Sequence, residues 1–158
     1  MTQSTDPAAV DPSIPRVVSA SREIAAPAAV IFELIADPAQ QPRWDGNDNL
    51  ASAEPGQRVH AVGDRFAVTL TKGTLRPNHV LEFEEGRRIA WTPAPDDVPL
   101  GHIWRWELEE LGEGRTRVTH TYDWTALRDE ARIRRALRTT ETNLLASIDR
   151  LKALAEAS

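Results

Sequence analysis

Two neighbouring stretches carry the side chains best suited to chemistry. His102, Trp104 and Trp106 alternate along HIWRWELEEL, and His120 and Tyr122 alternate along RTRVTHTYDW. An imidazole can remove a proton next to a carbonyl, and a phenol can donate a hydrogen bond to the oxyanion that forms. We therefore take His120 and Tyr122, flanked by His102, as candidate catalytic residues.

The same three residues also have a non-catalytic interpretation. Buried polar groups need hydrogen-bond partners, so His120 and Tyr122 could satisfy each other or meet a ligand or water. No GxSxG or HExxH motif is present, and the chain has no cysteine. The four histidines are dispersed, with His60 in a predicted surface loop, so we expect no metal site and no cofactor.

The elements that position these side chains follow from the hydropathy pattern. A strand is predicted for VVSASREI, and a short amphipathic helix follows, with Pro27 at its first position and Pro38 ending it. A link rich in Pro, Gly, Asn and Asp comes next. A weak strand is then predicted at residues 50–54, followed by five clearer ones: DRFAVTL, HVLEFEE, RRIAWTP, HIWRWELEEL and RTRVTHTYDW. Their short connections favour an antiparallel meander.

Strand alternation indicates which face of the sheet points inward. Opposite the face of His102, Trp104 and Trp106 lie Arg105 and Glu107, so the indole face should be the buried one. The partner strand behaves in the same way. The two inner faces together present two histidines, one tyrosine and three tryptophans, which is more polar than a dry core requires.

A long terminal helix is predicted from about Glu130 to Ala157. One stripe of it should face the sheet: Ile133, Leu137, Thr140, Leu144, Ile148, Leu151 and Ala155. The basic run ARIRRALR is either a phosphate or membrane patch or a solvated outer face. The interspersed acidic residues favour the solvated face.

A curved sheet over a straight helix leaves a cavity between them, and its lining carries the function. We expect ten residues to contribute to that lining: Trp44, Phe66, Leu70, His79, Trp91, Trp104, Trp106, Leu137, Thr140 and Leu144.

Length and charge limit the remaining possibilities. The 158 residues suit a single domain, predicted for residues 16–158, after a disordered polar tail at residues 1–15. A net charge of −5 argues against nucleic acid as a partner. No secretory signal and no bilayer-spanning apolar run are visible, so we expect a cytoplasmic protein without integral membrane association, either a monomer or a homodimer.

Several segments resemble one known family. ASREIAAPAAVIFELIADPAQQPRWDG, NHVLEFEEGRRIAW and HIWRWELEELGEGRTRVTHTYDW are similar to the polyketide cyclase/dehydrase group of the START-like (SRPBCC, Bet v 1-like) superfamily. The resemblance runs from about Val17 to Ala155. It implies an α+β helix-grip fold, with a curved antiparallel sheet of six or seven strands wrapped around a long C-terminal helix. One or two short helices should follow the first strand.

The same resemblance implies a deep hydrophobic cavity. Members of the superfamily bind lipids, sterols, hormones or polyketides, and some catalyse aldol cyclisation or dehydration. They share no catalytic signature, so no catalytic residue is carried over. Trp44 occupies the recurring tryptophan position after the first helix, where it has either a structural role or a ligand contact.

Three functions therefore stay open. The protein binds a hydrophobic, aromatic or polyketide-like molecule and cyclises or dehydrates it; it carries such a molecule or a lipid without chemistry; or it is a ligand-sensing regulatory protein. A collapsed cavity would favour a regulatory or partner protein in which the cavity is vestigial.

Overall fold

Alternating apolar and polar residues form seven antiparallel strands within residues 13–157, the part of the chain that the computed structural model describes. The strands are β1 (Val17–Ile24), β2 (Leu50–Ser52), β3 (Arg65–Leu70), β4 (Leu75–Glu84), β5 (Arg88–Pro93), β6 (Ile103–Gly112) and β7 (Arg115–Asp123). Their order in the sheet is β1-β7-β6-β5-β4-β3-β2. The tail predicted for residues 1–15 falls mainly on residues 1–12, which lie outside the described residues.

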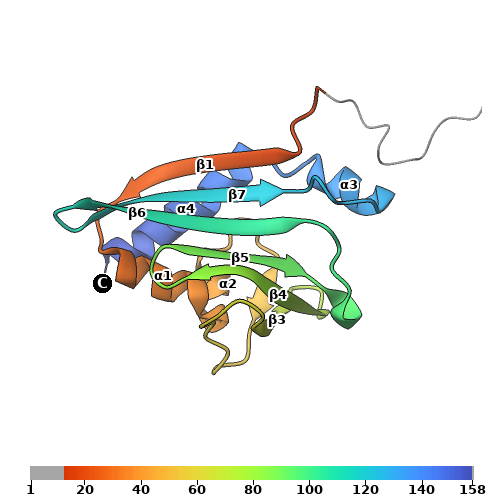
Figure 1. The fold of residues 1–158 in the computed structure, drawn as a ribbon, viewed down its shortest axis with the longest axis horizontal. Helices are drawn as coiled ribbons and strands as arrows, with labels where there is room; N and C mark the ends of the chain where they lie inside the picture. Colours follow the sequence, from red (N-terminus) through yellow and green to blue (C-terminus); the bar gives the residue numbers. More distant parts are fainter. Residues whose placement is uncertain (1–12, 158) are drawn as a thin grey trace, which may run out of the picture.

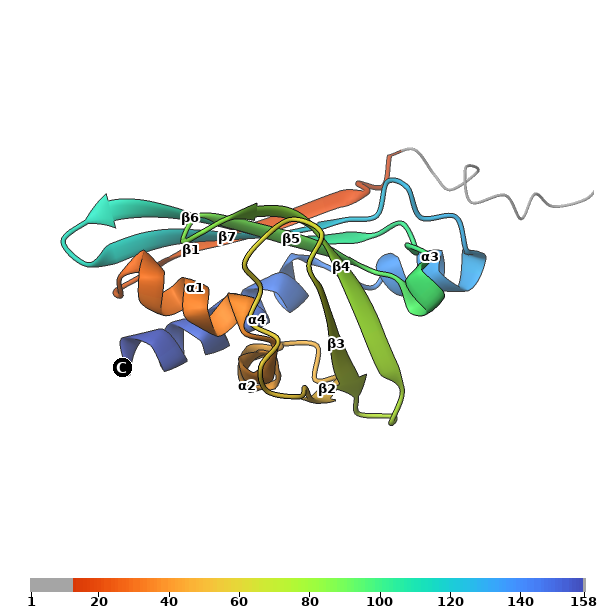
Figure 2. The same cartoon turned by 60° about the horizontal axis from the view of Figure 1, so that its bottom comes forward.

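The helices gather on one face of the sheet (Figures 1 and 2). They are α1 (Ala28–Ala36), η2 (Pro38–Gln40), α2 (Gln41–Trp44), η3 (Pro95–Asp97), α3 (Glu130–Ala136) and α4 (Glu141–Glu156). The end of α1 follows from its sequence, because a residue before proline avoids the helical region. Asp37, which precedes Pro38, is extended at φ −97° and ψ 107°. Pro27 was predicted at the first helical position, but it is the N-cap residue, and α1 begins one residue later at Ala28.

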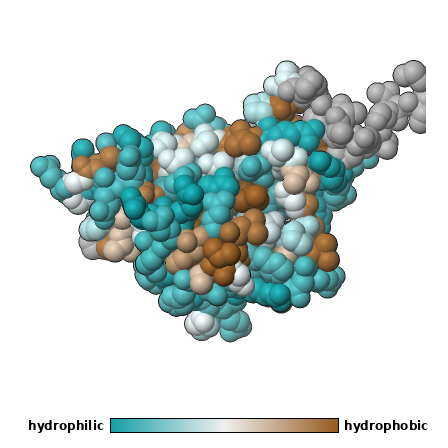
Figure 3. Space-filling model, in the orientation of Figure 1, coloured by the Kyte–Doolittle hydropathy of each residue, from teal (hydrophilic) through white to brown (hydrophobic). Residues whose placement is uncertain are grey.

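The core lies between the sheet and α1, α2 and α4. Helix α4 packs mainly against β1, which joins the sheet beside β7 and so brings the two ends of the domain together. Figure 3, drawn from the side of the sheet away from α4, shows a mainly hydrophilic surface with separate hydrophobic patches. Cross-strand ion pairs such as Arg105–Glu82 and Arg117–Glu109 occupy this outer face. The predicted curved antiparallel sheet with a C-terminal helix is confirmed.

The terminal helix differs from its prediction because it breaks in two. Helix α3 ends at Ala136, and α4 begins at Glu141. Thr140 is the N-cap of α4, and its backbone N–H donates to Asn143 Oδ1 at 2.8 Å, half of a capping box. Leu137 and Thr140 therefore leave the predicted stripe and are exposed. Five stripe residues are buried as predicted: Ile133, Leu144, Ile148, Leu151 and Ala155.

The stripe is tested by Leu151→Ala. Leu151 is fully buried, so truncation should lower the free energy of unfolding by about 2–5 kcal/mol, measured by urea denaturation. Leu137→Ala is the matched control. It lies in the break between α3 and α4 and should change stability by about 0.5 kcal/mol or less. Equal losses in the two variants would contradict the break.

Candidate ligand-binding site

The inner face of β6 and β7 carries a stack of flat side chains. The register pairs Trp106 with His120 and Trp104 with Tyr122. The His120 imidazole lies parallel to the Trp106 indole, with ring centroids 3.7 Å apart and planes at 11°. The Trp104 indole is also near-parallel to the imidazole, with centroids 5.6 Å apart and planes at 20°. His120 thus stacks with two indoles, and the predicted inner face is the buried one.

The position of His120 fixes its protonation. Its Nδ1 lies 3.1 Å from the carbonyl oxygen of Arg105, so Nδ1–H donates there and Nε2 is the unprotonated nitrogen. Burial lowers the pKa of His120 to about 3, and the hydrogen bond to Arg105 acts in the opposite direction. His120 is therefore neutral at pH 7.

A second aromatic group forms where β6 begins. The Tyr122 ring lies 4.3 Å from the Trp104 ring and 5.7 Å from that of His102. Burial, followed by three nearby arginines, lowers the pKa of His102 to about 4. Burial also raises the pKa of Tyr122 to about 12, so its hydroxyl keeps its proton. His102 Nδ1 is buried without a hydrogen-bond partner.

The loop after α2 closes over this face. Trp44 ends α2, donates from Nε1 to the Leu34 carbonyl at 2.8 Å, and meets Trp106 edge-on at 5.2 Å. The next residues bind α4: Gly46 N–H donates to Ser147 Oγ at 2.8 Å. A Cβ on Gly46 would lie only 2.5 Å from the Ser147 nitrogen, so only glycine permits this approach.

Asp45 stabilises the conformation of the same loop through hydrogen bonds within it. It is buried, and its carboxylate accepts backbone N–H bonds from Asn47 and Asn49, both at 3.2 Å, and one from the Asn47 side chain. Burial raises the pKa of Asp45, while these bonds oppose the change. Both carboxylate oxygens are engaged, which makes Asp45 a residue that folds the loop.

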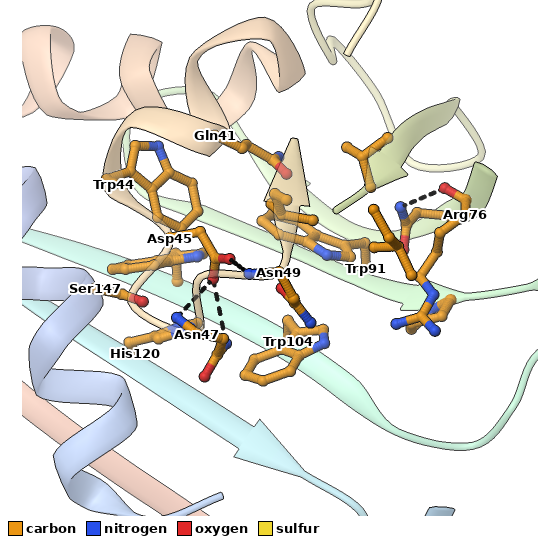
Figure 4. Close-up of a pocket in the computed structure, with 16 residues that line it drawn as sticks. Gln41, Trp44, Asp45, Asn47, Asn49, Arg76, Trp91, Trp104, His120 and Ser147 are labelled. Carbon is orange, nitrogen blue, oxygen red and sulfur yellow. Dashed lines mark hydrogen bonds between the residues drawn. The ribbon is translucent and has the colours of Figure 1, made fainter. Parts of the chain in front are cut away.

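Two adjoining cavities open between this loop, the sheet and the helices. The first has a volume of about 70 Å³, and Figure 4 shows Trp44, Trp91, Trp104 and His120 around it. Its full lining is Gln41, Trp44, Asp45, Asn47, Asn49, Leu50, Val68, Leu70, Arg76, Asn78, Trp91, Pro93, Trp104, Trp106, His120 and Ser147.

The second cavity has a volume of about 140 Å³ and lies toward α3. It is lined by Asn47, Asn49, Arg76, Leu100, His102, Trp104, Tyr122, Leu127, Arg132, Arg135 and Thr139. Four residues line both cavities: Asn47, Asn49, Arg76 and Trp104. Both cavities are small, because pockets for drug-sized ligands have volumes of roughly 300 Å³ or more.

Most of the predicted site residues border these cavities. Trp44, Leu70, Trp91, Trp106 and His120 line the first, and His102 and Tyr122 line the second. His120 lines the first cavity and Tyr122 the second, and Trp104 contacts both rings, so the two candidate catalytic groups do not line the same cavity.

Five predicted lining residues lie elsewhere. Asn78 and Val80 point inward, so His79 points outward, with Nε2 3.1 Å from Asp97 Oδ1. Phe66 and Leu144 are buried outside the two linings, Phe66 behind Trp91 with ring centroids 5.4 Å apart. Leu137 and Thr140 are exposed because the helix breaks there.

The sequence-based prediction missed the polar part of the lining. Asp45, Asn47 and Asn49 come from the link after the first helix, and none of them was among the predicted lining residues. Arg132 and Arg135 belong to the basic run that was predicted to be a solvated outer face, yet both border the second cavity. The high density of arginine in that run was the sequence feature that could have indicated a charged part of the lining.

Neither metal nor membrane features appear in residues 13–157. No three His, Asp or Glu side chains gather in a way that could hold a metal ion. None of the helices there combines the length and the hydropathy needed to cross a bilayer.

Comparison with known proteins places the chain. A family model described as polyketide cyclase / dehydrase and lipid transport matches residues 15–156. The chain belongs to this family. An uncharacterised protein of Mycobacterium tuberculosis strain H37Rv is 33% identical over 123 residues, which cover 71% of this chain and 49% of that relative. The chain thus spans about half the length of the curated relatives it matches.

Several solved structures share this fold. Protein MLL2253 from Mesorhizobium loti has a TM-score of 0.67 at 18% identity, covering 90% of this chain and 98% of that one. The di-domain ARO/CYC StfQ from the steffimycin biosynthetic pathway has a TM-score of 0.57 at 22% identity, covering 88% and 44% respectively. At these identities the likeness shows the fold alone. The family expected from the sequence, and its helix-grip fold, are confirmed.

The buried imidazoles predict an acid-labile fold. In the unfolded chain both histidines become protonated as the pH falls below 6.5. In the folded protein they become protonated only near their lowered pKa values, about 3 for His120 and about 4 for His102. Stability should therefore fall with pH from 6.5 downward, by up to about 1.4 kcal/mol per pH unit for each imidazole. Urea denaturation at pH 7 and pH 4.5 should show a smaller loss for His120→Gln than for the wild type.

The comparison has an internal control. His60 is exposed, so His60→Gln should keep the wild-type loss between the two pH values. Other titrating groups are common to all three proteins and cancel. An unchanged loss in His120→Gln would contradict the neutral, buried state of His120.

Proposed function

We propose that this protein binds a small aromatic molecule in the two adjoining cavities between the sheet, the loop after α2 and helix α3. The observation that supports this is the lining, where indoles of Trp44, Trp91 and Trp104 border space that the protein leaves unfilled. Flat π-faces of this kind stack on aromatic rings and add binding energy beyond burial.

The cavity volumes favour a compact ligand. An apolar cavity of about 150 Å³ is known to hold benzene. The cavities, about 70 and 140 Å³, adjoin at Trp104 and thus suit a ligand of one or two rings. A longer polyketide-like chain would need the loop after α2 to move, and that loop is held to α4 by Gly46 and by the Arg150–Asp48 ion pair.

The protonation of the histidines favours binding over proton abstraction. A general base works best when its pKa is near the working pH. The pKa values of His120, about 3, and of His102, about 4, make both imidazoles weak bases at neutral pH. We therefore prefer a carrier or sensor of the ligand to a cyclase or dehydratase that uses these residues.

Titration with neutral aromatic amides tests this proposal. Benzamide and 2-naphthamide should bind saturably in isothermal titration calorimetry and change the tryptophan emission, because indoles line the cavities. Trp104 borders both cavities, so Trp104→Leu should weaken binding by about tenfold.

Phe83→Leu is the matched control. Phe83 packs edge-on against Phe32 at 5.7 Å and lines neither cavity, so this variant should keep wild-type affinity. The proposal fails if neither amide binds the wild type, or if both variants lose affinity equally.

A further inference from the structure

Three arginines converge on the second cavity. Arg76 comes from β4, where it stands opposite Val68 in β3, and Arg132 and Arg135 come from α3. None of the residues that line this cavity is acidic. The cavity thus concentrates three positive charges in a protein whose formal net charge is −5.

Arg132 pairs with Asp129 at 3.4 Å, whereas Arg76 differs from the ion-paired arginines of the described residues. Arg58 binds Glu33 and Glu85, and Arg105 binds Glu82 through two hydrogen bonds. Arg76 is half-buried, and the described residues provide no carboxylate within ion-pair distance of its guanidinium. Burial, followed by Arg135 and Arg132, lowers the pKa of Arg76. Burying Arg76 beside two other positive charges, without a counter-charge of its own, is unfavourable. Arg76 therefore contributes little to the stability of the fold.

Neutral hydrogen-bonding groups surround the same space. His102 Nδ1 is buried there without a partner, and Tyr122 holds its hydroxyl proton. The Asn47 and Asn49 side chains border the cavity from the loop. A buried polar atom without a partner in a concave site is what a bound ligand group would satisfy.

We propose that the ligand is an aromatic carboxylate whose anionic group is held in the second cavity by Arg76, Arg132 and Arg135. This inference rests on the proposed function and specifies its substrate class. The ring lies among the indoles of the first cavity and against Trp104, and the carboxylate points toward α3.

A carboxylate suits this site for geometric reasons. The guanidinium group is a planar fork of donors that matches the two oxygens of a carboxylate. The ion replaces the counter-charge that Arg76 lacks. Trp104 borders both cavities, so one small molecule can contact the arginines and the indoles at once.

Two isosteric probes test the inference by isothermal titration calorimetry. 2-Naphthoate and 2-naphthamide differ in charge but hardly in shape. The wild type should bind 2-naphthoate at least tenfold more tightly than 2-naphthamide, because a hydrogen bond to a charged group contributes more than a neutral one. The preference should shrink as NaCl is raised from 50 to 500 mM.

Variants assign the preference to the arginines. Arg76→Met and Arg135→Met should each reduce it by about tenfold while leaving 2-naphthamide binding within twofold. Arg135 is exposed, so its variant keeps the test valid if Arg76→Met fails to fold. Arg134→Met is the matched control, since Arg134 lies on the same helix, pairs with Glu130 and borders neither cavity.

The possible outcomes separate the two proposals. If 2-naphthamide binds and 2-naphthoate binds no better, the carboxylate site is refuted and the aromatic-binding function stands. Loss of the preference in Arg134→Met as well as Arg135→Met would also refute the site, because it would show a general effect of charge. If neither probe binds, both proposals fail together.

Discussion

The register between β6 and β7 is the constraint on which the site depends. It sets Trp106 beside His120 and Trp104 beside Tyr122. A shift of β7 by one residue would turn His120 and Tyr122 to the outer face, away from the two indoles. The stack of two indoles around His120, with centroids at 3.7 and 5.6 Å, exists only in this register. The helices then have a flat aromatic surface to cover rather than a layer of branched side chains.

Coverage of that surface is incomplete, and the reason lies in the helices. The loop after α2 reaches α4 only because Gly46 lacks a side chain, and Arg150 holds the loop by donating to the Asp45 carbonyl. On the other side, the break before Thr140 divides the terminal helix into α3 and α4. The loop and the two helices enclose part of the aromatic surface, and the space left over forms the two cavities.

Strand alternation was enough to predict most of the aromatic lining, because period-two patterns determine which face is buried. His102, Trp104, Trp106, His120 and Tyr122 all came from that rule. Helix periodicity failed for Leu137 and Thr140, since the pattern continues through a capping site that ends the regular helix. Helix periodicity also gave no sign that Arg132 and Arg135, on the predicted solvated face, border a cavity. Their orientation depends on where α3 packs, which is a tertiary property that local sequence does not contain.

The distribution of charge around the site determines how a ligand would be oriented. At the first cavity His120 is neutral, and flat indoles accept a ring in more than one rotation. Shape alone therefore does not select one pose. At the second cavity three guanidinium groups face a space without acidic residues. Electrostatic interactions between charges are stronger in a partly buried site than in water, so the arginines favour the pose that brings a negative group to α3. In this arrangement the aromatic stack supplies the contact area, and the arginines supply the direction.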